Sequence, residues 1–558
     1  MTKKRADEIL IGAVLTMDDA GSRAEAVAIA DGAILATGTR EAMLELRGPR
    51  TAVRDFPGCT ILPGFNDTHA HMDSIGARLV RPSLEEARSI ADVQARIRAL
   101  AQATPKGEWI VTMPVGTPPF YFDGPSALAE GRMPNRHELD AAAPDHPVYI
   151  PSPGGYWGEP PCHAALNSRA LQLNGIDRHT RPTSPNTVME TDTHGEPTGV
   201  FVEKSYVNLL EPDLLPAVPR FTYDERRDGV TRAMALYHRM GTTSIYEGHG
   251  SAPDVLAAYK EVWERGDLTM RTSMVVSPRW RSIEEAEVVM RDWSPLLRGR
   301  GIGDAWFRVS GFFIAHGGDP NVQKVQQKDL QHVSWAGFTQ QANSTADFEA
   351  LCLLAGRYDL RVHTIVSDKL ALVAPVIARL AQRFPIGERR WVLEHVSRSS
   401  PADLATIRNA GVAVTLIPGQ YIWKHATPFM SLSEEELDYL SPARQLHELG
   451  VPVSAGTDAV PYNPLFCLWA MTTRKERHTG RTIGARGIVS PEVGLRLLTR
   501  AGAYLSFEEH VKGQLVPGHY ADIAVLDGDP LALAGDALLD LQCRATLVGG
   551  KWVHGITG

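Results

Sequence analysis

Two histidines separated by one residue are the clearest chemical feature of the sequence. His69 and His71 follow the apolar segment 61–65, and residues with this spacing on an extended strand point to the same face. Two imidazoles on one face can bind one divalent cation. The spacing alone is weak evidence, because such pairs also arise by chance, so it predicts a metal site only if further ligands converge on it.

Three further potential ligands lie at or near the ends of short β-branched segments. His363 follows Leu-Arg-Val, His395 follows Trp-Val-Leu-Glu, and Asp458 closes Val-Pro-Val-Ser-Ala-Gly-Thr. The parallel strands of a TIM-type barrel deliver the residues at their carboxyl ends to one face. We therefore predict that these side chains meet the histidine pair. Each also has a plainer interpretation, since a histidine can be an ordinary core or surface residue and Asp458 can cap a helix. Glu394 is expected to point to the opposite side of its strand and is interpreted as structural.

The central part of the chain alternates strand and helix patterns in the way that a βα barrel requires. Helical patterns occupy 227–240 and 370–384. The predicted fold class is α/β, a (β/α)8 TIM-type barrel over residues 61–505. Its eight predicted strands span 61–67, 242–247, 271–276, 306–314, 360–366, 391–396, 412–417 and 451–457.

The two ends of the chain share a different pattern. Residues 1–60 and 506–558 contain short strand-like segments bounded by glycine and proline. Neither end has enough strands to bury both faces of a sheet, so we predict that they pack together as one small β-sandwich domain. The alternative is two independent flaps on the barrel.

The interval from about 78 to 225 is too long for a single barrel crossover. It contains a predicted helix at 90–102 and a predicted strand at 147–151. We expect an insertion over the mouth of the barrel, because the loops at that face build active sites. The alternative is a peripheral insertion far from the chemistry.

The sequence also contains several longer motifs. These are Pro-Gly-Phe-Asn-Asp-Thr-His-Ala-His (63–71), Glu-Leu-Asp-Ala-Ala-Ala-Pro (138–144), Leu-Asn-Ser-Arg-Ala-Leu (166–171), Gly-Glu-Pro-Thr-Gly (195–199), Gly-Thr-Thr-Ser (241–244) and Gly-Thr-Asp (456–458). Together they resemble the amidohydrolase superfamily of metal-dependent hydrolases, and in particular its family-3 branch, which includes N-substituted formamide deformylases. The resemblance covers nearly the whole chain. It implies a metal site built from His69, His71, His363, His395 and Asp458.

One departure from the superfamily pattern bears on the number of ions. Two-metal members normally use a bridging ligand from the fourth barrel strand, commonly a carboxylated lysine. No lysine occurs between Lys260 and Lys324, and Val-Ser-Gly-Phe stands at 309–312. We therefore expect one divalent ion per chain, of the zinc class. A second ion held by Glu247, His249 or His316 is the alternative.

The resemblance implies hydrolysis by a water molecule that the metal activates. Asp458 is the predicted general base and then acid. His395 either coordinates a second ion or hydrogen-bonds the substrate, where it would help the metal to polarise the carbonyl. The predicted substrate is a small apolar or aromatic molecule with a linear amide or N-acyl group. Alternatives are an esterase, a deaminase, a decarboxylase, or a protein that binds a ligand without turning it over. The candidate substrate-binding residues, which could equally be core residues, are Trp157, His163, Tyr246, His249, His316 and Trp423.

Composition excludes several other classes of function. The 558 residues carry a formal charge of −8 without long runs of either sign. The sequence therefore shows no cluster of basic residues of the kind that binds nucleic acid. The five cysteines are scattered and form no Cys-x-x-Cys motif. No stretch reaches the roughly 18 apolar residues of a membrane span, and Ala-Asp-Glu follows the basic N-terminus where a signal peptide would turn apolar. A cytoplasmic protein with no membrane partner is expected, and by analogy with other barrel enzymes a homodimer.

Overall fold

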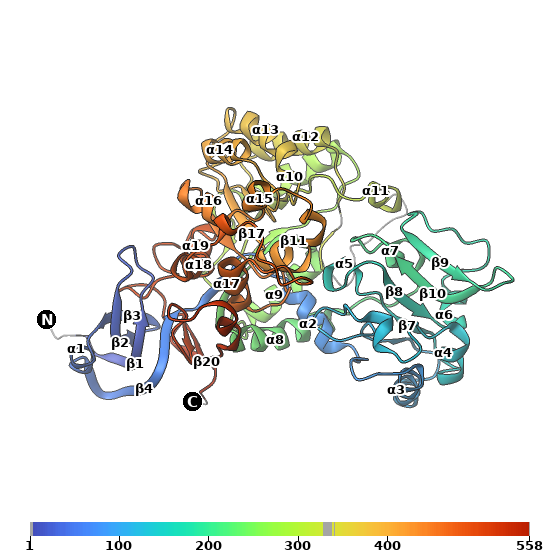
Figure 1. Ribbon diagram of the computed structural model, residues 1–558, viewed down its shortest axis with the longest axis horizontal. Helices are drawn as coiled ribbons and strands as arrows, with labels where there is room; N and C mark the ends of the chain where they lie inside the picture. The colour runs from blue at the N-terminus through green and yellow to red at the C-terminus, as the bar shows by residue number, and fades with distance from the viewer. Residues whose placement is uncertain (1–3, 327–336, 340, 557–558) are drawn as a thin grey trace. The chain divides into compact units, whose positions relative to one another are not determined.

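Eight parallel strands form a nearly closed barrel (Figure 1). The computed structural model describes residues 4–326, 337–339 and 341–556. In order around the barrel the strands are β5 (Phe65–Asp67), β11 (Thr242–Ser251), β12 (Arg271–Val276), β14 (Phe307–Phe313), β15 (Val362–Ile365), β16 (Val392–Glu394), β17 (Ala413–Leu416) and β18 (Val453–Ala455). Each lies within or overlaps one of the eight predicted segments, so the predicted barrel is confirmed.

The seam between β18 and β5 is held by side chains as well as backbone. Asp67 accepts hydrogen bonds from the backbone N and the hydroxyl of Thr457, at 2.8 and 2.5 Å. The backbone N of Asp458 donates to the carbonyl of His69 at 2.8 Å. These hydrogen bonds fix Asp458, which follows β18, beside His69 and His71, which follow β5.

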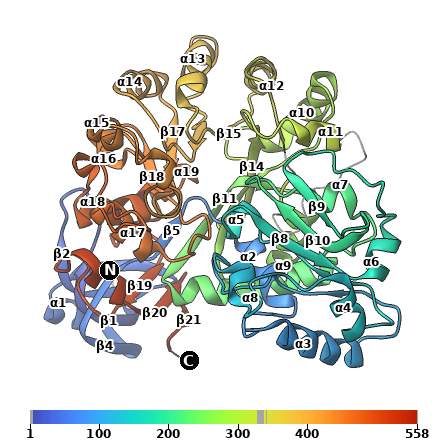
Figure 2. The same ribbon diagram turned by 45° about the vertical axis from the view of Figure 1, so that its right-hand side comes forward.

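Helices that alternate with the strands cover the outside of the barrel. Figure 2 shows α12 (Thr345–Arg357), α13 (Leu370–Ala381) and α14 (Pro401–Ala410) beside the strands that they connect. Serine begins two of them, because Ser344 caps α12 and Ser400 forms a capping box with Asp403 at the start of α14. The helical pattern at 370–384 corresponds to α13, and the pattern at 227–240 corresponds to α8 (Tyr223–Arg239).

The two ends of the chain meet in one continuous sheet (Figure 1). Its strands, in order, are β21 (Lys551–His554), β20 (Cys543–Val548), β19 (Ile523–Leu526), β4 (Arg47–Pro63), β1 (Ala6–Leu15), β2 (Arg23–Ala30) and β3 (Ala33–Gly38). The halves join where β19 pairs antiparallel with β4. One buried cluster draws on both ends, including Leu10, Val27, Ile523 and Leu547. The predicted association of the termini is therefore confirmed, while the domain boundaries at 60/61 and 505/506 stay predictions.

Residues 73–230, with 317–343, form a compact unit separate from the barrel and the terminal sheet. Its sheet contains β6 (Ile110–Val111), β7 (Val148–Ile150), β8 (Cys162–Leu166), β10 (Pro197–Glu203) and β9 (Thr187–Thr191). The predicted helix at 90–102 is α3 (Ile90–Ala103), and the predicted strand at 147–151 is β7. A place for this unit over the barrel mouth stays a prediction. Among the described residues, no helix has both the length and the apolar character to cross a membrane.

Candidate metal centre

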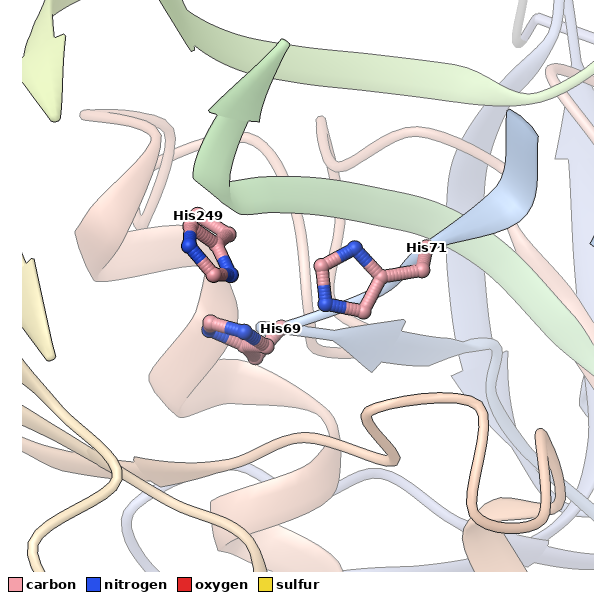
Figure 3. A group of neighbouring side chains, drawn as sticks. All are labelled: His69, His71 and His249. Atoms are coloured by element: carbon pink, nitrogen blue, oxygen red, sulfur yellow. The ribbon is translucent and has the colours of Figure 1, made fainter. Parts of the chain in front are cut away.

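Imidazoles and a carboxylate gather at the carboxyl end of the barrel strands. His69 and His71 come directly after β5, and His249 comes from β11. Figure 3 shows these three rings gathered together, and their ligand atoms lie within 4.8 Å of one another. A second group, His69, His395 and Asp458, meets the same criterion. The two groups share His69, so they form one continuous cluster.

The distances within the cluster are short. The Nε2 atoms of His69 and His395 are 2.9 Å apart. Oδ1 of Asp458 lies 3.1 Å from Nε2 of His71 and 3.9 Å from Nε2 of His69, and Oδ2 lies 3.9 Å from Nε2 of His395. His69 is completely buried, and His395 and Asp458 are nearly so. Four of the five predicted metal ligands are thus brought together in a site largely closed to water.

The backbone turns sharply at two of these residues. His395 and Asp458 adopt positive φ angles of 58° and 54°, and Ala459 has a φ of 56°. Non-glycine residues in this left-handed region cost on the order of 1–3 kcal/mol each, and such residues concentrate at functional sites. The turn at His395 also ends the alternation of β16, because Glu394 is the last residue of the strand.

Glu394 faces the cluster, contrary to expectation. Its Oε2 accepts from Nδ1 of His69 at 2.9 Å, and its Oε1 accepts from Nδ1 of His363 at 2.7 Å. The expectation that it points to the far side of its strand is wrong, because it assumed that the strand continues through His395. A carboxylate directly before a predicted ligand at a strand end was the signal that could have found it.

The fifth predicted ligand, His363, lies slightly apart. It belongs to neither group of mutually close atoms, although Glu394 links it to His69. Its ring is stacked on Tyr246, with 5.0 Å between centroids. Its buried Nε2 has no hydrogen-bond partner among the described residues. This nitrogen is therefore available to a ligand that is not a protein group.

A hydroxyl from the loop after β17 also supports the cluster. Tyr421, in the short helix Gly419–Lys424, lies 3.1 Å from Nδ1 of His395 and 2.8 Å from the hydroxyl of Ser367. Sequence reasoning missed this residue. Nothing in the local pattern distinguishes Tyr421 from the other aromatic residues of the loop, because its role depends on how the loop folds back.

The protonation states of the cluster suit a divalent cation. Burial lowers the pKa of His69 and of His395 to about 3, and that of His363 to about 4, so all three are neutral imidazoles at pH 7. Burial acts to raise the pKa of Asp458, but the neighbouring histidines, above all His395, bring it well below its ordinary value. Oδ2 of Asp458 has no hydrogen-bond partner in the described part of the chain. Neutral imidazole nitrogens with a carboxylate oxygen are the ligands of catalytic zinc sites, so the residues fit such an ion.

The other predicted residues of the barrel have varied surroundings. Tyr246 lies in the barrel interior, where its hydroxyl accepts from Nη1 of Arg361 at 2.5 Å. His316 pairs with the hydroxyl of Thr345 at 3.1 Å. Glu247 accepts hydrogen bonds from the backbone N of Met72 and the hydroxyl of Tyr259. Substrate binding by Tyr246 or His316, and a second ion at Glu247, stay predictions.

Three more predicted substrate-binding residues lie elsewhere. Trp423 meets Phe466 edge to face, with ring centroids 5.1 Å apart. Trp157 and His163 belong to the separate unit, where Trp157 packs under the guanidinium of Arg78 and His163 lies on β8. Their roles, like that of His249, stay predictions.

Comparison with known proteins agrees with this geometry. The sequence model of the Amidohydrolase family matches residues 52–554. The "Putative amidohydrolase YtcJ" of Bacillus subtilis (strain 168) is 24% identical, over 97% of this chain and 98% of its own. The "N-substituted formamide deformylase" of Arthrobacter pascens is 25% identical over the full length of both.

Solved structures with the same fold include two hydrolases. One is an uncharacterized metal-dependent hydrolase from Pyrococcus horikoshii OT3, with a TM-score of 0.67 and 20% identity over 94% of this chain and 98% of its own. The other is the atrazine chlorohydrolase TrzN from Arthrobacter aurescens TC1 complexed with zinc, with a TM-score of 0.53 and 16% identity over 98% of this chain and 94% of its own. At these identities the likeness concerns the fold alone.

Proposed function

Because this chain belongs to the amidohydrolase family and is a metal-dependent hydrolase, we propose that it cleaves a carbon–nitrogen bond other than a peptide bond, in a linear amide or N-acyl group. The substrate is a small apolar or aromatic molecule. The observation that carries the proposal is the convergence of neutral imidazoles and one carboxylate at the carboxyl end of the barrel, the face at which enzymes of this fold do their chemistry.

His69, His71, His395 and Asp458 would hold one divalent cation of the zinc class, and His363 can add a further nitrogen. When bound, such an ion supplies a Lewis acid that activates water near neutral pH and polarises a carbonyl group. His249 stands beside His71, with ring centroids 5.8 Å apart, where it can contact the substrate. His69, His363 and His395 are buried, and a buried setting strengthens each electrostatic interaction with the reacting group.

Asp458 would carry the proton. Its depressed pKa keeps it a carboxylate at neutral pH, and its Oδ2 has no hydrogen bond within the described chain. It accepts a proton from the attacking water as the oxygen bonds to the carbonyl carbon. It then returns that proton to the nitrogen as the carbon–nitrogen bond breaks. The products are an amine and a carboxylic acid.

The choice of an amide over other substrates has support from one relative. The protein from Arthrobacter pascens that aligns over the full length of both chains is named an N-substituted formamide deformylase. The formyl group is the smallest acyl group. Hydrolysis of a formamide and of a larger N-acyl amine therefore both require attack on a carbonyl carbon and protonation of the leaving nitrogen.

The proposal is tested by supplying zinc-loaded protein with N-substituted formamides, larger N-acyl amines, matched esters and aryl carboxylates. We expect equal amounts of amine and carboxylate from at least one amide, and product formation about 10²–10⁴-fold slower with the Asp458→Asn variant. Turnover of esters alone, release of ammonia from an aminated ring, or release of carbon dioxide would replace the proposal with another hydrolytic or decarboxylating reaction. Tight binding without any product would contradict an enzymatic function.

A further inference from the structure

We propose that Glu394 is a positioning residue that holds His69 and His363 in the same ring tautomer, so that both Nε2 atoms are unprotonated and can act as metal ligands. The inference rests on the proposed metal site and deepens it. It assigns a role to a residue that contacts no substrate and that lies outside the predicted ligand set.

The two carboxylate oxygens of Glu394 contact two different histidine rings. Oε2 lies 2.9 Å from Nδ1 of His69, and Oε1 lies 2.7 Å from Nδ1 of His363. All three side chains are completely buried. A carboxylate can only accept hydrogen bonds. Both contacts are therefore made only if each ring carries its proton on Nδ1.

This placement of the protons leaves the opposite nitrogens bare. A neutral imidazole has one ring proton, so a proton on Nδ1 makes Nε2 an acceptor and a metal ligand. Nε2 of His69 faces Nε2 of His395 at 2.9 Å, and Nε2 of His363 has no hydrogen-bond partner in the described chain. One carboxylate thus prepares two ligands, one that follows β5 and one on β15, which are not adjacent strands of the barrel.

Gly248 of β11 lies close to the carboxylate of Glu394. A Cβ atom at Gly248 would lie 2.6 Å from Oε1 of Glu394 and 3.0 Å from Nδ1 of His69. Glycine at this point of β11 therefore leaves room for the hydrogen-bonded pair. The charge of Arg361, which is 1% exposed, interacts favourably with that of Glu394.

Another buried carboxylate provides a matched control. Glu203 is 1% exposed, and its Oε1 accepts from the backbone N atoms of Leu209 and Leu210 at the start of α7 (Leu210–Leu214). It contacts no histidine in the described hydrogen bonds. Replacement of Glu203 by glutamine converts a buried carboxyl group to an amide without changing a ring tautomer.

The first test reads the tautomers directly in metal-free protein. Histidine rings labelled with 15N give distinct NMR signals for protonated and bare nitrogens, and each ring is assigned from its His→Gln variant. We expect His69 and His363 to carry their protons on Nδ1. A proton on Nε2 of either ring would overturn the proposal, whether or not the protein turns over any substrate.

The second test measures the affinity for Zn²⁺ by competition with a chelator. In Glu394→Gln the amide group cannot accept from both rings, so one ring must move its proton to Nε2. We expect the dissociation constant for Zn²⁺ to rise about 10–100-fold, the usual effect of losing such a partner, and one Nδ1 proton signal to be lost. Glu203→Gln should bind Zn²⁺ like the wild type.

Wild-type affinity in folded Glu394→Gln protein would overturn the role of Glu394. Should that variant fail to fold, Gly248→Ala displaces the carboxylate through steric contact and must weaken Zn²⁺ binding in the same direction; unchanged affinity there would equally overturn it. A wild-type protein that binds no Zn²⁺ would instead contradict the proposed function. The tautomers of the two rings in metal-free protein would still test whether Glu394 sets them.

Discussion

Two buried sites, one at each end of the barrel, differ in how their polar groups are paired. At the amino end, Arg271 and Asp522 form a buried pair with two hydrogen bonds of 2.6 and 3.1 Å. His238 is 2% exposed, and its two ring nitrogens pair with the carbonyl of Thr242 and the hydroxyl of Thr269, both at 3.0 Å. Every polar atom named here has a protein partner.

The carboxyl end leaves buried polar atoms open. Nε2 of His363 and Oδ2 of Asp458 have no hydrogen-bond partner in the described chain, and His395 has a left-handed backbone. Buried unsatisfied groups cost about 1–3 kcal/mol each, so they persist where a function requires them. Burial alone therefore does not mark a functional histidine, because both nitrogens of His238 pair with the scaffold whereas Nε2 of His363 has no hydrogen-bond partner in the described chain. The contrast also predicts that substitutions at the two ends have different effects.

The largest effect is expected from Asp458→Asn at the carboxyl end. Asparagine keeps the shape of the side chain but cannot act as a base, so kcat should fall about 10²–10⁴-fold while zinc remains bound. Steady-state kinetics and metal analysis of the same preparation measure both quantities. Asp403→Asn, which alters only the capping box of α14, should keep wild-type turnover. Unchanged kcat in Asp458→Asn would remove Asp458 from the mechanism.

At the amino end, Asp522→Asn should affect stability rather than chemistry. The change leaves the buried charge of Arg271 without its partner, which typically costs about 3–5 kcal/mol of unfolding free energy. Urea unfolding measures this cost, and the turnover per folded molecule should not change. Asp145→Asn, which breaks an exposed pair with Lys106, should cost less than about 1 kcal/mol. Loss of turnover in folded Asp522→Asn would contradict the separation of the two ends.

His238 should make the amino end sensitive to acid. Burial lowers its pKa from 6.5 to about 4, so below pH 6.5 the unfolded chain takes up a proton that the folded chain refuses. Its contribution therefore lowers the unfolding free energy as the pH falls from 6.5 towards 4, by about 1.4 kcal/mol per pH unit. Urea unfolding of His238→Gln over this range should give a plot of unfolding free energy against pH whose slope is smaller by the contribution of one proton. Parallel curves for the variant and the wild type would count against this assignment.

The smallest effect is expected from Tyr421→Phe. The change removes one hydrogen bond to His395, worth about 0.5–1.5 kcal/mol, so kcat should fall by a factor of about 2 to 10. Tyr358→Phe removes a hydroxyl that pairs with Glu287 on the outer helices and should have no effect on kcat. A loss as large as that in Asp458→Asn would give Tyr421 a direct part in catalysis.

The barrel could be predicted from the sequence because its signals are local. Each strand is a short buried segment, and β12 was predicted with the bounds that the structure gives it, Arg271–Val276. The proximity of His69 and Asp458 could also be predicted from the sequence, because parallel strands that close into a barrel bring their carboxyl ends to one face. The pairing of the two termini followed from the need of each to bury a sheet face.

The supporting residues could not be predicted, because they depend on geometry that no local pattern encodes. Glu394 faces the site only because the backbone turns at His395. Tyr421 reaches His395 only because the loop after β17 folds back over the strand end. Asp67 and Thr457 close the seam across 390 residues of chain. Each depends on a turn or a distant contact rather than on hydrophobic periodicity.

The proposed function requires one divalent cation at the carboxyl-end cluster for turnover. This requirement can be measured by stripping the protein with a chelator and returning Zn²⁺ stepwise while following hydrolysis of an amide substrate. We expect no turnover in the stripped protein and full recovery at one equivalent per chain, with no recovery in His69→Ala. Full turnover without metal, or recovery in His69→Ala equal to that of the wild type, would contradict it.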